Sequence, residues 1–130
     1  MNKLISSLTF FKIFLLSAVA VTPQKTDVKV NLVQMRMVGE CTTTAYCGCA
    51  SCCGVAGNAT ASGEMPKSKH TVAHETLPFG TKIKFQGDET IYTVEDRGVF
   101  GDWFDVYFDT HEEALNYGMQ NRNAYIIMDD

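Results

Sequence analysis

The sequence contains no run of lysine or arginine, and its formal net charge is −4 over 130 residues. A protein that binds nucleic acid needs a basic surface that neutralises phosphates, so we expect no nucleic-acid partner. Internal repeats and low-complexity segments are also absent. Hydrophobic residues make up 45% and charged residues 20% of the chain. This composition excludes a disordered or collagen-like chain, and the length suits one domain rather than two.

The sequence also lacks a hydrophobic run long enough to cross a bilayer comfortably. Residues 1–12 contain two lysines and no acid, and residues 13–20 are apolar and end in the small-residue pattern Ala-Val-Ala. This pattern is typical of a cleaved signal peptide, with an uncleaved anchor as the alternative. No cysteine follows the small residues, which disfavours a lipoprotein. We therefore predict a signal peptide over residues 1–20 and a tether over residues 21–37. The mature protein is expected in the cell envelope, the periplasm or the extracellular space, without a membrane partner.

Helical patterns are scarce in the remainder, residues 38–130, which we predict to be one domain. The one predicted helix covers residues 110–117, with Asp109 as N-cap, Glu112 completing a capping box and Gly118 at its end. Short segments of alternating or apolar character, separated by glycine and proline, predict strands. These segments are residues 38–46, 81–85, 91–95, 103–108 and 124–128. Many short strands with a single short helix predict a mainly β protein that forms a small closed barrel.

Three titratable residues stand where a barrel could use them for chemistry. Asp105 lies inside an apolar strand, Asp96 lies at the end of another strand, and His74 follows a short apolar segment. Each also has an ordinary structural explanation. Asp105 could face solvent, Asp96 could bond its own backbone in a turn, and His74 could be a structural histidine.

Four motifs in order give these residues a context: residues 60–64 (TASGE), 71–81 (TVAHETLPFGT), 95–98 (EDRG) and 104–107 (FDVY). Together they resemble two related families of double-psi β-barrels. One is the rare lipoprotein A family. The other is the three-aspartate (3D) domain found at the C-terminus of membrane-bound lytic transglycosylase A and in small cell-wall proteins of Gram-positive bacteria and their phages.

The resemblance spans about residues 40–128 and implies a six-stranded double-psi barrel. Residues 46–54 and 105–114 are most similar to small 3D proteins, whereas residues 74–80 and 96–98 are more similar to rare lipoprotein A. The chain departs from the three-aspartate pattern at the first acid, where His74 stands. The second and third acids correspond to Asp96 and Asp105.

The activity that this resemblance implies is that of a peptidoglycan lytic transglycosylase. Such an enzyme cleaves the β-1,4 bond between N-acetylmuramic acid and N-acetylglucosamine and leaves a 1,6-anhydro-muramic product. Asp105 is the expected general acid/base, Asp96 its electrostatic partner and His74 an auxiliary group in the same groove. Glycan strands of peptidoglycan are the expected partner of a monomeric protein. The expected substrate-binding residues are Thr60, Ser62, Gly63, Trp103 and Tyr107.

Two other classes of function stay open. The first is a non-catalytic glycan-binding module of the expansin type, which keeps the groove without turnover. The second is a structural or assembly protein of a phage or envelope machine, which would use the barrel only as a scaffold. Acids retained within an apolar strand argue against the second.

Four of the five cysteines lie within seven residues, at Cys47, Cys49, Cys52 and Cys53. They could form disulfides, for which Cys47–Cys53 and Cys49–Cys53 are feasible pairs in a loop. Alternatively, the four thiolates could hold a structural metal, although a second distant Cys-x-x-Cys pair is missing. We favour the disulfides, and expect no cofactor apart from this alternative. Cys41 is expected to be a small strand residue.

Overall fold

The structure, a computed structural model, describes residue 20 and residues 33–129. Residues 1–19 of the predicted signal peptide and residues 21–32 of the predicted tether lie outside the described residues, and residues 34–37 of the predicted tether belong instead to the first strand. Residues 33–129 form six strands and two short helices. These elements are β1 (Gln34–Cys47), α1 (Ala50–Cys53), β2 (Thr71–Ala73), β3 (Lys82–Phe85), β4 (Ile91–Asp96), β5 (Trp103–Phe108), α2 (His111–Tyr117) and β6 (Gln120–Met128).

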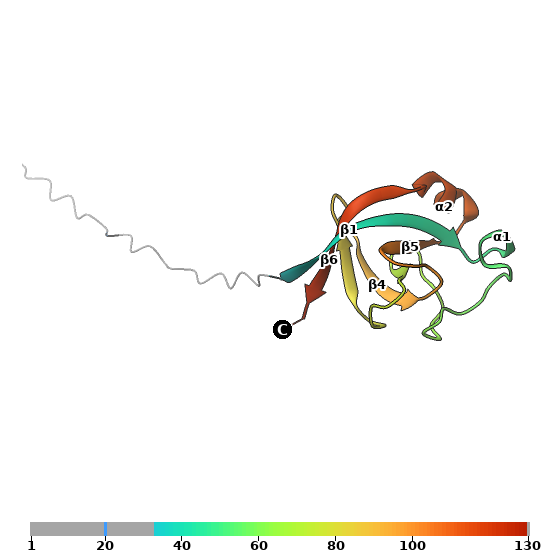
Figure 1. The fold of residues 1–130 in the computed structure, drawn as a ribbon, viewed down its shortest axis with the longest axis horizontal. Helices are drawn as coiled ribbons and strands as arrows, with labels where there is room; N and C mark the ends of the chain where they lie inside the picture. The colour runs from blue at the N-terminus through green and yellow to red at the C-terminus, as the bar shows by residue number, and fades with distance from the viewer. Residues whose placement is uncertain (1–19, 21–32, 130) are drawn as a thin grey trace, which may run out of the picture. The chain divides into compact units, whose positions relative to one another are not determined.

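The six strands close into a barrel in the order β1-β5-β2-β4-β3-β6 (Figure 1). Two neighbouring pairs, β1 with β5 and β2 with β4, are parallel, and the other four pairs are antiparallel. The prediction of a mainly β protein with a closed six-stranded barrel is therefore confirmed. Helices α1 and α2 lie together at one end of the barrel, beside the last residues of β1 (Figure 1).

Alternation along the strands builds the core, because every second side chain of a strand points to the same face. In β5, Phe104 and Val106 are fully buried, and in β3 so are Ile83 and Phe85. The rings of Phe85 and Phe104 meet edge to face with centroids 5.3 Å apart. A fully buried side chain of this size contributes about 1.5–3 kcal/mol to stability. Asp105, which lies between Phe104 and Val106 in β5, consequently faces away from the core.

The helices differ in two respects from the sequence prediction. A second helix exists, since residues 50–53 form the single turn α1, which is too short to show a helical period. Helix α2 is capped by Thr110 and not by Asp109. The Thr110 hydroxyl accepts a hydrogen bond from the Glu113 amide, and the Glu113 carboxylate accepts one from the Thr110 amide. The capping box is therefore present, one residue further along the chain.

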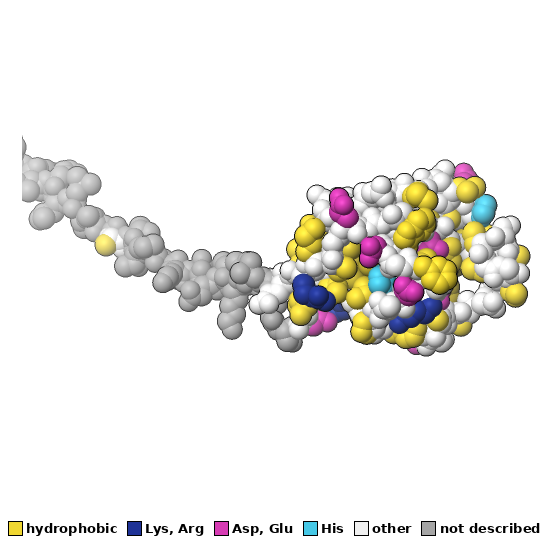
Figure 2. Space-filling model, in the orientation of Figure 1, with side chains coloured by type: hydrophobic (Ala, Val, Ile, Leu, Met, Phe, Trp, Pro, Cys, Tyr) yellow, Lys and Arg dark blue, Asp and Glu magenta, His cyan; other side chains and the backbone are white. Residues whose placement is uncertain are grey.

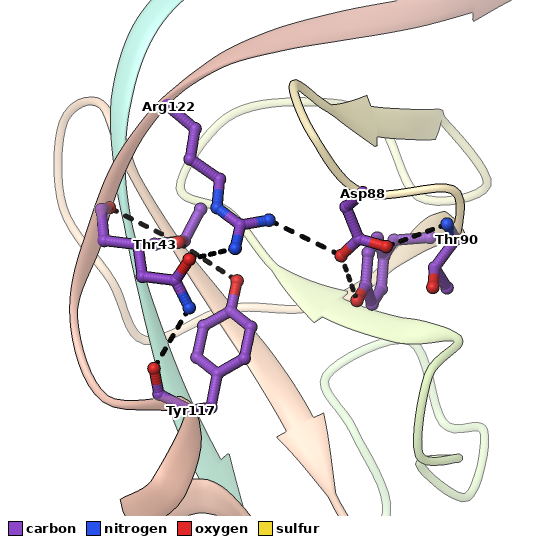
Figure 3. Close-up of polar contacts among 7 residues, drawn as sticks. Thr43, Asp88, Thr90, Tyr117 and Arg122 are labelled. Carbon is purple, nitrogen blue, oxygen red and sulfur yellow. Dashed lines mark hydrogen bonds and ion pairs between the residues drawn. The ribbon is translucent and has the colours of Figure 1, made fainter.

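A polar cluster ties the β3–β4 turn to β6 and α2 (Figure 3). The guanidinium of Arg122 lies 3.5 Å from the carboxylate of Asp88 and also contacts Gln120. Asp88 accepts hydrogen bonds from the Thr90 amide at 2.8 Å and from the Tyr92 hydroxyl at 2.9 Å. Burial alone would raise the pKa of Asp88, but these donors and the charge of Arg122 outweigh it and lower the pKa.

Among the described residues, no helix has the length and apolar character needed to cross a membrane.

Candidate functional site

The strand register brings the two predicted acids to either side of one small residue. Ala73 of β2 pairs with Asp105 of β5 on one side and with Asp96 of β4 on the other. On the far side of β5, Asp105 pairs with Thr44 of β1. Thr44, Asp105, Ala73 and Asp96 thus follow one another across four adjacent strands. The residue between the two acids in this register is the small Ala73, which is itself buried.

Asp105 is a half-buried carboxyl group with one side-chain donor. The hydroxyl of Thr44 donates a hydrogen bond to Asp105 Oδ1 at 2.8 Å. Burial raises the pKa of Asp105, the Thr44 hydrogen bond lowers it in part, and the nearby charge of Asp96 raises it further. The net effect is a raised pKa, which favours the protonated form that a general acid requires.

Asp96 is held by three donors. The Tyr46 hydroxyl donates to Asp96 Oδ2 at 2.7 Å, and the backbone amides of Ala61 and Arg97 donate to Oδ1 at 2.9 Å each. These bonds come from β1, from the loop before β2 and from the residue that follows β4. The position of this carboxylate is therefore set by three separate segments of the chain.

Two tyrosines extend the site along β1 and β5. Tyr46 and Tyr107 are paired in the register, and their rings meet edge to face with centroids 5.3 Å apart. Burial and the hydrogen bond to Asp96 both raise the pKa of Tyr46, so its hydroxyl stays protonated and donates. Tyr46 thereby links the strand that carries Thr44 to the acid on β4.

The predicted loop of residues 60–64 lies against Asp96 through the amide of Ala61. The Thr60 hydroxyl bonds the Ser62 hydroxyl and the Glu64 carbonyl, both at 2.9 Å, and the Ser62 amide donates to the Glu95 carbonyl. Gly63 has a φ of +90°, which residues with a side chain rarely adopt. The side chain of Thr60 is thus used to shape the loop, and the loop's contact with an acid is made by backbone.

A cavity of about 570 Å³ opens near the start of β5. Trp103 lies two residues before Asp105 on β5 and therefore points to the same side of the strand. Its partner in the register, Thr42, also lines the cavity. The other lining residues are Glu40, Cys41, Phe100, Gly101, Asp102 and Asn121. Figure 2 shows one face of the molecule, on which acidic and hydrophobic side chains interleave.

His74 occupies a different setting from the two acids. Its ring packs on Phe104, a core residue, with centroids 4.4 Å apart. Its Nδ1 accepts hydrogen bonds from the amides of Thr76 and Leu77, both at 3.1 Å. Burial and the charge of Arg97 lower the pKa of His74, which favours the neutral ring that can accept these bonds. The structure therefore brings Asp96 and Asp105 together and places His74 in the loop after β2.

The predicted cysteine cluster has a geometry that the sequence did not indicate. All five cysteines are free thiols, so neither expected disulfide, Cys47–Cys53 or Cys49–Cys53, is formed. Instead, Cys47, Cys49 and Cys52 gather around His111, with all four ligand atoms within 4.8 Å of one another. These four residues could bind a metal. Cys53 points elsewhere, and its thiol donates to the Cys47 carbonyl at 3.1 Å.

Sequence reasoning missed four residues that shape these sites: Thr44, Tyr46, Ala61 and His111. The alternation of Thr44 and Tyr46 in one strand was a usable signal, because both had to face the same side. Ala61 acts through its backbone, which no side-chain pattern reveals. His111 lies 59 residues from Cys52, so only the fold brings them together.

Neither a protein-family model nor a curated protein sequence matches this chain. The resemblance to the three-aspartate and rare lipoprotein A barrels thus rests on the four sequence motifs.

Proposed function

We propose that this protein cleaves the glycan strands of peptidoglycan as a lytic transglycosylase, with Asp105 as the general acid and base. The observation that carries this proposal is the half-buried Asp105 carboxyl group, whose pKa is raised and which faces a second acid, Asp96, across Ala73. Titratable groups whose pKa values are shifted by burial and by a charged neighbour are frequent at active sites. The motifs that resemble transglycosylase barrels supply the substrate class.

In the proposed reaction, protonated Asp105 donates its proton to the glycosidic oxygen between muramic acid and glucosamine. The bond from that oxygen to C1 of the muramic residue breaks, and positive charge develops at C1. The Asp105 carboxylate then accepts the proton of the C6 hydroxyl, whose oxygen bonds to C1 and closes the 1,6-anhydro ring. No water is consumed, and Asp105 returns to its protonated form.

Asp96 has an electrostatic role in this proposal. Hydrolytic glycosidases use a second carboxylate as a nucleophile or to activate water. Here the substrate's own hydroxyl is the nucleophile, so one proton-transferring acid suffices. The charge of Asp96 keeps the proton on Asp105 in the free enzyme and stabilises positive charge at the sugar ring in the transition state.

The cavity beside Trp103 gives the glycan a place to lie. Trp103 is 42% exposed and Phe100 is 78% exposed, so both offer apolar surface to a sugar ring. The acids Glu40 and Asp102 and the amide of Asn121 supply polar groups for its hydroxyls. A glycan chain that lies in this cavity would extend toward Asp105, which is two residues after Trp103 in β5.

A non-catalytic glycan-binding module is the second candidate, and the position of His74 favours it. The resembled three-aspartate barrels have an acid at that point of the motif. In this chain the residue is a histidine whose ring packs on the core residue Phe104. Only two of the three acids therefore remain for catalysis.

The test uses intact sacculi and purified protein, with mass spectrometry of the released fragments. We expect the wild type to release anhydro-muropeptides, and Asp105→Asn to reduce the rate about 10²–10⁴-fold while binding to sacculi persists. The matched control is Asp129→Asn, the same chemical change at a side chain that is 70% exposed, and it should retain the wild-type rate. Binding without release by the wild type would establish the binding module. Wild-type turnover by Asp105→Asn would refute the assignment of the acid.

The pH dependence tests the pairing of the two acids. Activity should fall on the alkaline side, where Asp105 loses the proton that it must donate. Because the charge of Asp96 helps to raise the pKa of Asp105, Asp96→Asn should move this limb to lower pH. Its amide oxygen can still accept the bonds from Ala61 and Arg97. An unmoved limb in this variant would mean that the two carboxylates are not coupled.

A further inference from the structure

We propose that Cys47, Cys49, Cys52 and His111 form a structural zinc site that fastens the cysteine loop and α2 to the end of the barrel. Three sulfur atoms surround one ring nitrogen, the Nδ1 of His111. It lies 3.8 Å from Cys47 Sγ, 3.6 Å from Cys49 Sγ and 3.4 Å from Cys52 Sγ. Cys47 Sγ is 3.0 Å from Cys49 Sγ and 3.5 Å from Cys52 Sγ.

These distances are close to those of a tetrahedral zinc site. With Zn–S bonds of about 2.3 Å and Zn–N bonds of about 2.0–2.1 Å, tetrahedral geometry separates two sulfurs by about 3.8 Å and a sulfur from a nitrogen by about 3.6 Å. The three sulfur–nitrogen distances lie within a few tenths of an ångström of this value. The two sulfur–sulfur distances are shorter, and small rotations of the cysteine side chains would adjust them.

The composition of the cluster selects the metal and its role. Three thiolates and an imidazole are soft and borderline ligands, which suit zinc and not magnesium or calcium. Four protein ligands close the tetrahedron, whereas catalytic zinc sites keep one position for water or substrate. The site is therefore structural, and it differs from the four-thiolate site that the sequence alone allowed.

The two remaining cysteines lie outside the cluster. The thiol of Cys53 donates to the carbonyl of Cys47 at 3.1 Å and does not join the four converging ligand atoms. Cys41 belongs to the hydrophobic core of the barrel. Cys53, which is exposed, is therefore a suitable control position for variants of the ligands.

The ligands come from three segments of the chain, of which α1 is the least buried. Cys47 ends β1, Cys52 lies in the single turn α1, and His111 is the first residue of α2. Helix α1 buries none of its residues, so hydrophobic burial contributes little to its attachment. A bound metal would supply that attachment, as in small domains whose folding depends on zinc.

The site also borders the proposed catalytic face. A side chain on Gly48, between the first two ligands, would place its Cβ 3.3 Å from the Tyr107 hydroxyl. The cysteine loop thus covers Tyr107, which contacts Tyr46 and through it Asp96. Loss of the metal should loosen this contact. Zinc would therefore affect the acid site only by holding the cysteine loop against Tyr107, without taking part in the reaction.

The test measures metal content and needs no activity, so its outcome is independent of the proposed function. The full chain is purified under reducing conditions without chelator, and zinc is quantified by mass spectrometry. We expect about one zinc ion per chain. Replacement of zinc by Co²⁺ should give the visible absorption bands of tetrahedral cobalt with thiolate ligands.

Variants at exposed positions identify the ligands without disturbing the core. Cys52→Ser and His111→Ala should each weaken zinc binding by more than about 100-fold, the loss that removal of even an outer hydrogen-bond partner can reach. The matched control Cys53→Ser should bind zinc as the wild type does. A chelator should lower the unfolding temperature of the wild type and of Cys53→Ser.

Three results would overturn the proposal. The first is a chain without stoichiometric zinc, whether its thiols are free or joined in disulfides. The second is equal loss of zinc in Cys53→Ser and Cys52→Ser, which would indicate a site of four thiolates. The third is undiminished affinity in His111→Ala.

Discussion

Asp105 and Asp88 are both half-buried carboxyl groups on this barrel, and their surroundings shift their pKa values in opposite directions. Asp88 faces the cation Arg122 and accepts bonds from Thr90 and Tyr92. Asp105 receives one bond, from Thr44, and has a second acid as its charged neighbour.

This comparison separates an acid that stabilises a fold from an acid that can transfer a proton. Burial disfavours the charge on both carboxylates, so the difference comes from what each one contacts. Donors and a cation compensate the buried charge of Asp88, and its proton is lost at ordinary pH. Asp105 is compensated only in part, and its raised pKa brings its proton closer to neutral pH. The same residue type thus acquires two properties on one barrel.

The largest expected difference between the two acids is in turnover. Asp105→Asn should slow the release of anhydro-muropeptides about 10²–10⁴-fold, since the amide cannot donate and accept a proton. Asp88→Asn, assayed at a temperature where it is folded, should stay within a few-fold of the wild type. Rates measured on sacculi compare the two variants. Equal losses of rate in the two variants would contradict a specific proton-transfer role for Asp105.

Stability should show the opposite order. Asp88→Asn removes the charge that faces Arg122, a side chain that is only 17% exposed. We expect a loss of about 1–3 kcal/mol in the free energy of unfolding, the cost of leaving such a group poorly paired. Urea denaturation measures it. Glu89→Gln is the matched control. The side chain of Glu89 is 95% exposed and pairs with Lys84. Loss of its charge should change the free energy of unfolding by less than about 0.5 kcal/mol.

His74 sharpens the comparison with a base in place of an acid. Its pKa is lowered in the fold, so the unfolded chain binds the proton more tightly. Stability should therefore be full above the ordinary pKa of 6.5 and should fall as the pH drops below that value. His74→Asn keeps an acceptor for the amides of Thr76 and Leu77 but cannot become charged. Unfolding measured from pH 8 to pH 5 should show a weaker pH dependence in this variant, and an unchanged slope would contradict the prediction.

The smallest expected effect is a gain in stability from Asp105→Asn. The fold raises the pKa of Asp105 above its ordinary 3.8, so the native state binds the proton more tightly and loses stability as the pH rises through that range. Asparagine resembles the protonated acid and can still accept the bond from Thr44. At pH 7 the variant should be more stable by up to about 1 kcal/mol, and near pH 3 the gain should vanish. Thermal unfolding at both pH values measures the difference.

Much of the barrel could be predicted from local sequence. Strands β3, β4 and β5 were predicted to within about one residue, because their alternation matches the strand period. Strand β6 begins at Gln120, four residues before the predicted start, since its first residues are polar and are held by pairing with β1. The start of β1 at Gln34 likewise depends on its partner, β6. Such pairings join residues far apart in the chain, so no local pattern indicates them.

The candidate sites divide in the same way. From the sequence alone came the type of chemistry at each point: an acid within an apolar strand at Asp105, an acid at a strand end at Asp96, and a group of thiols in one loop. Only the tertiary structure set Ala73 between the two acids, aligned Thr44 with Asp105 and brought His111 to the cysteines. Residue types fix what a group can donate or bind. The pKa of an acid and the shape of a ligand set depend on neighbours that only the closing of the barrel supplies.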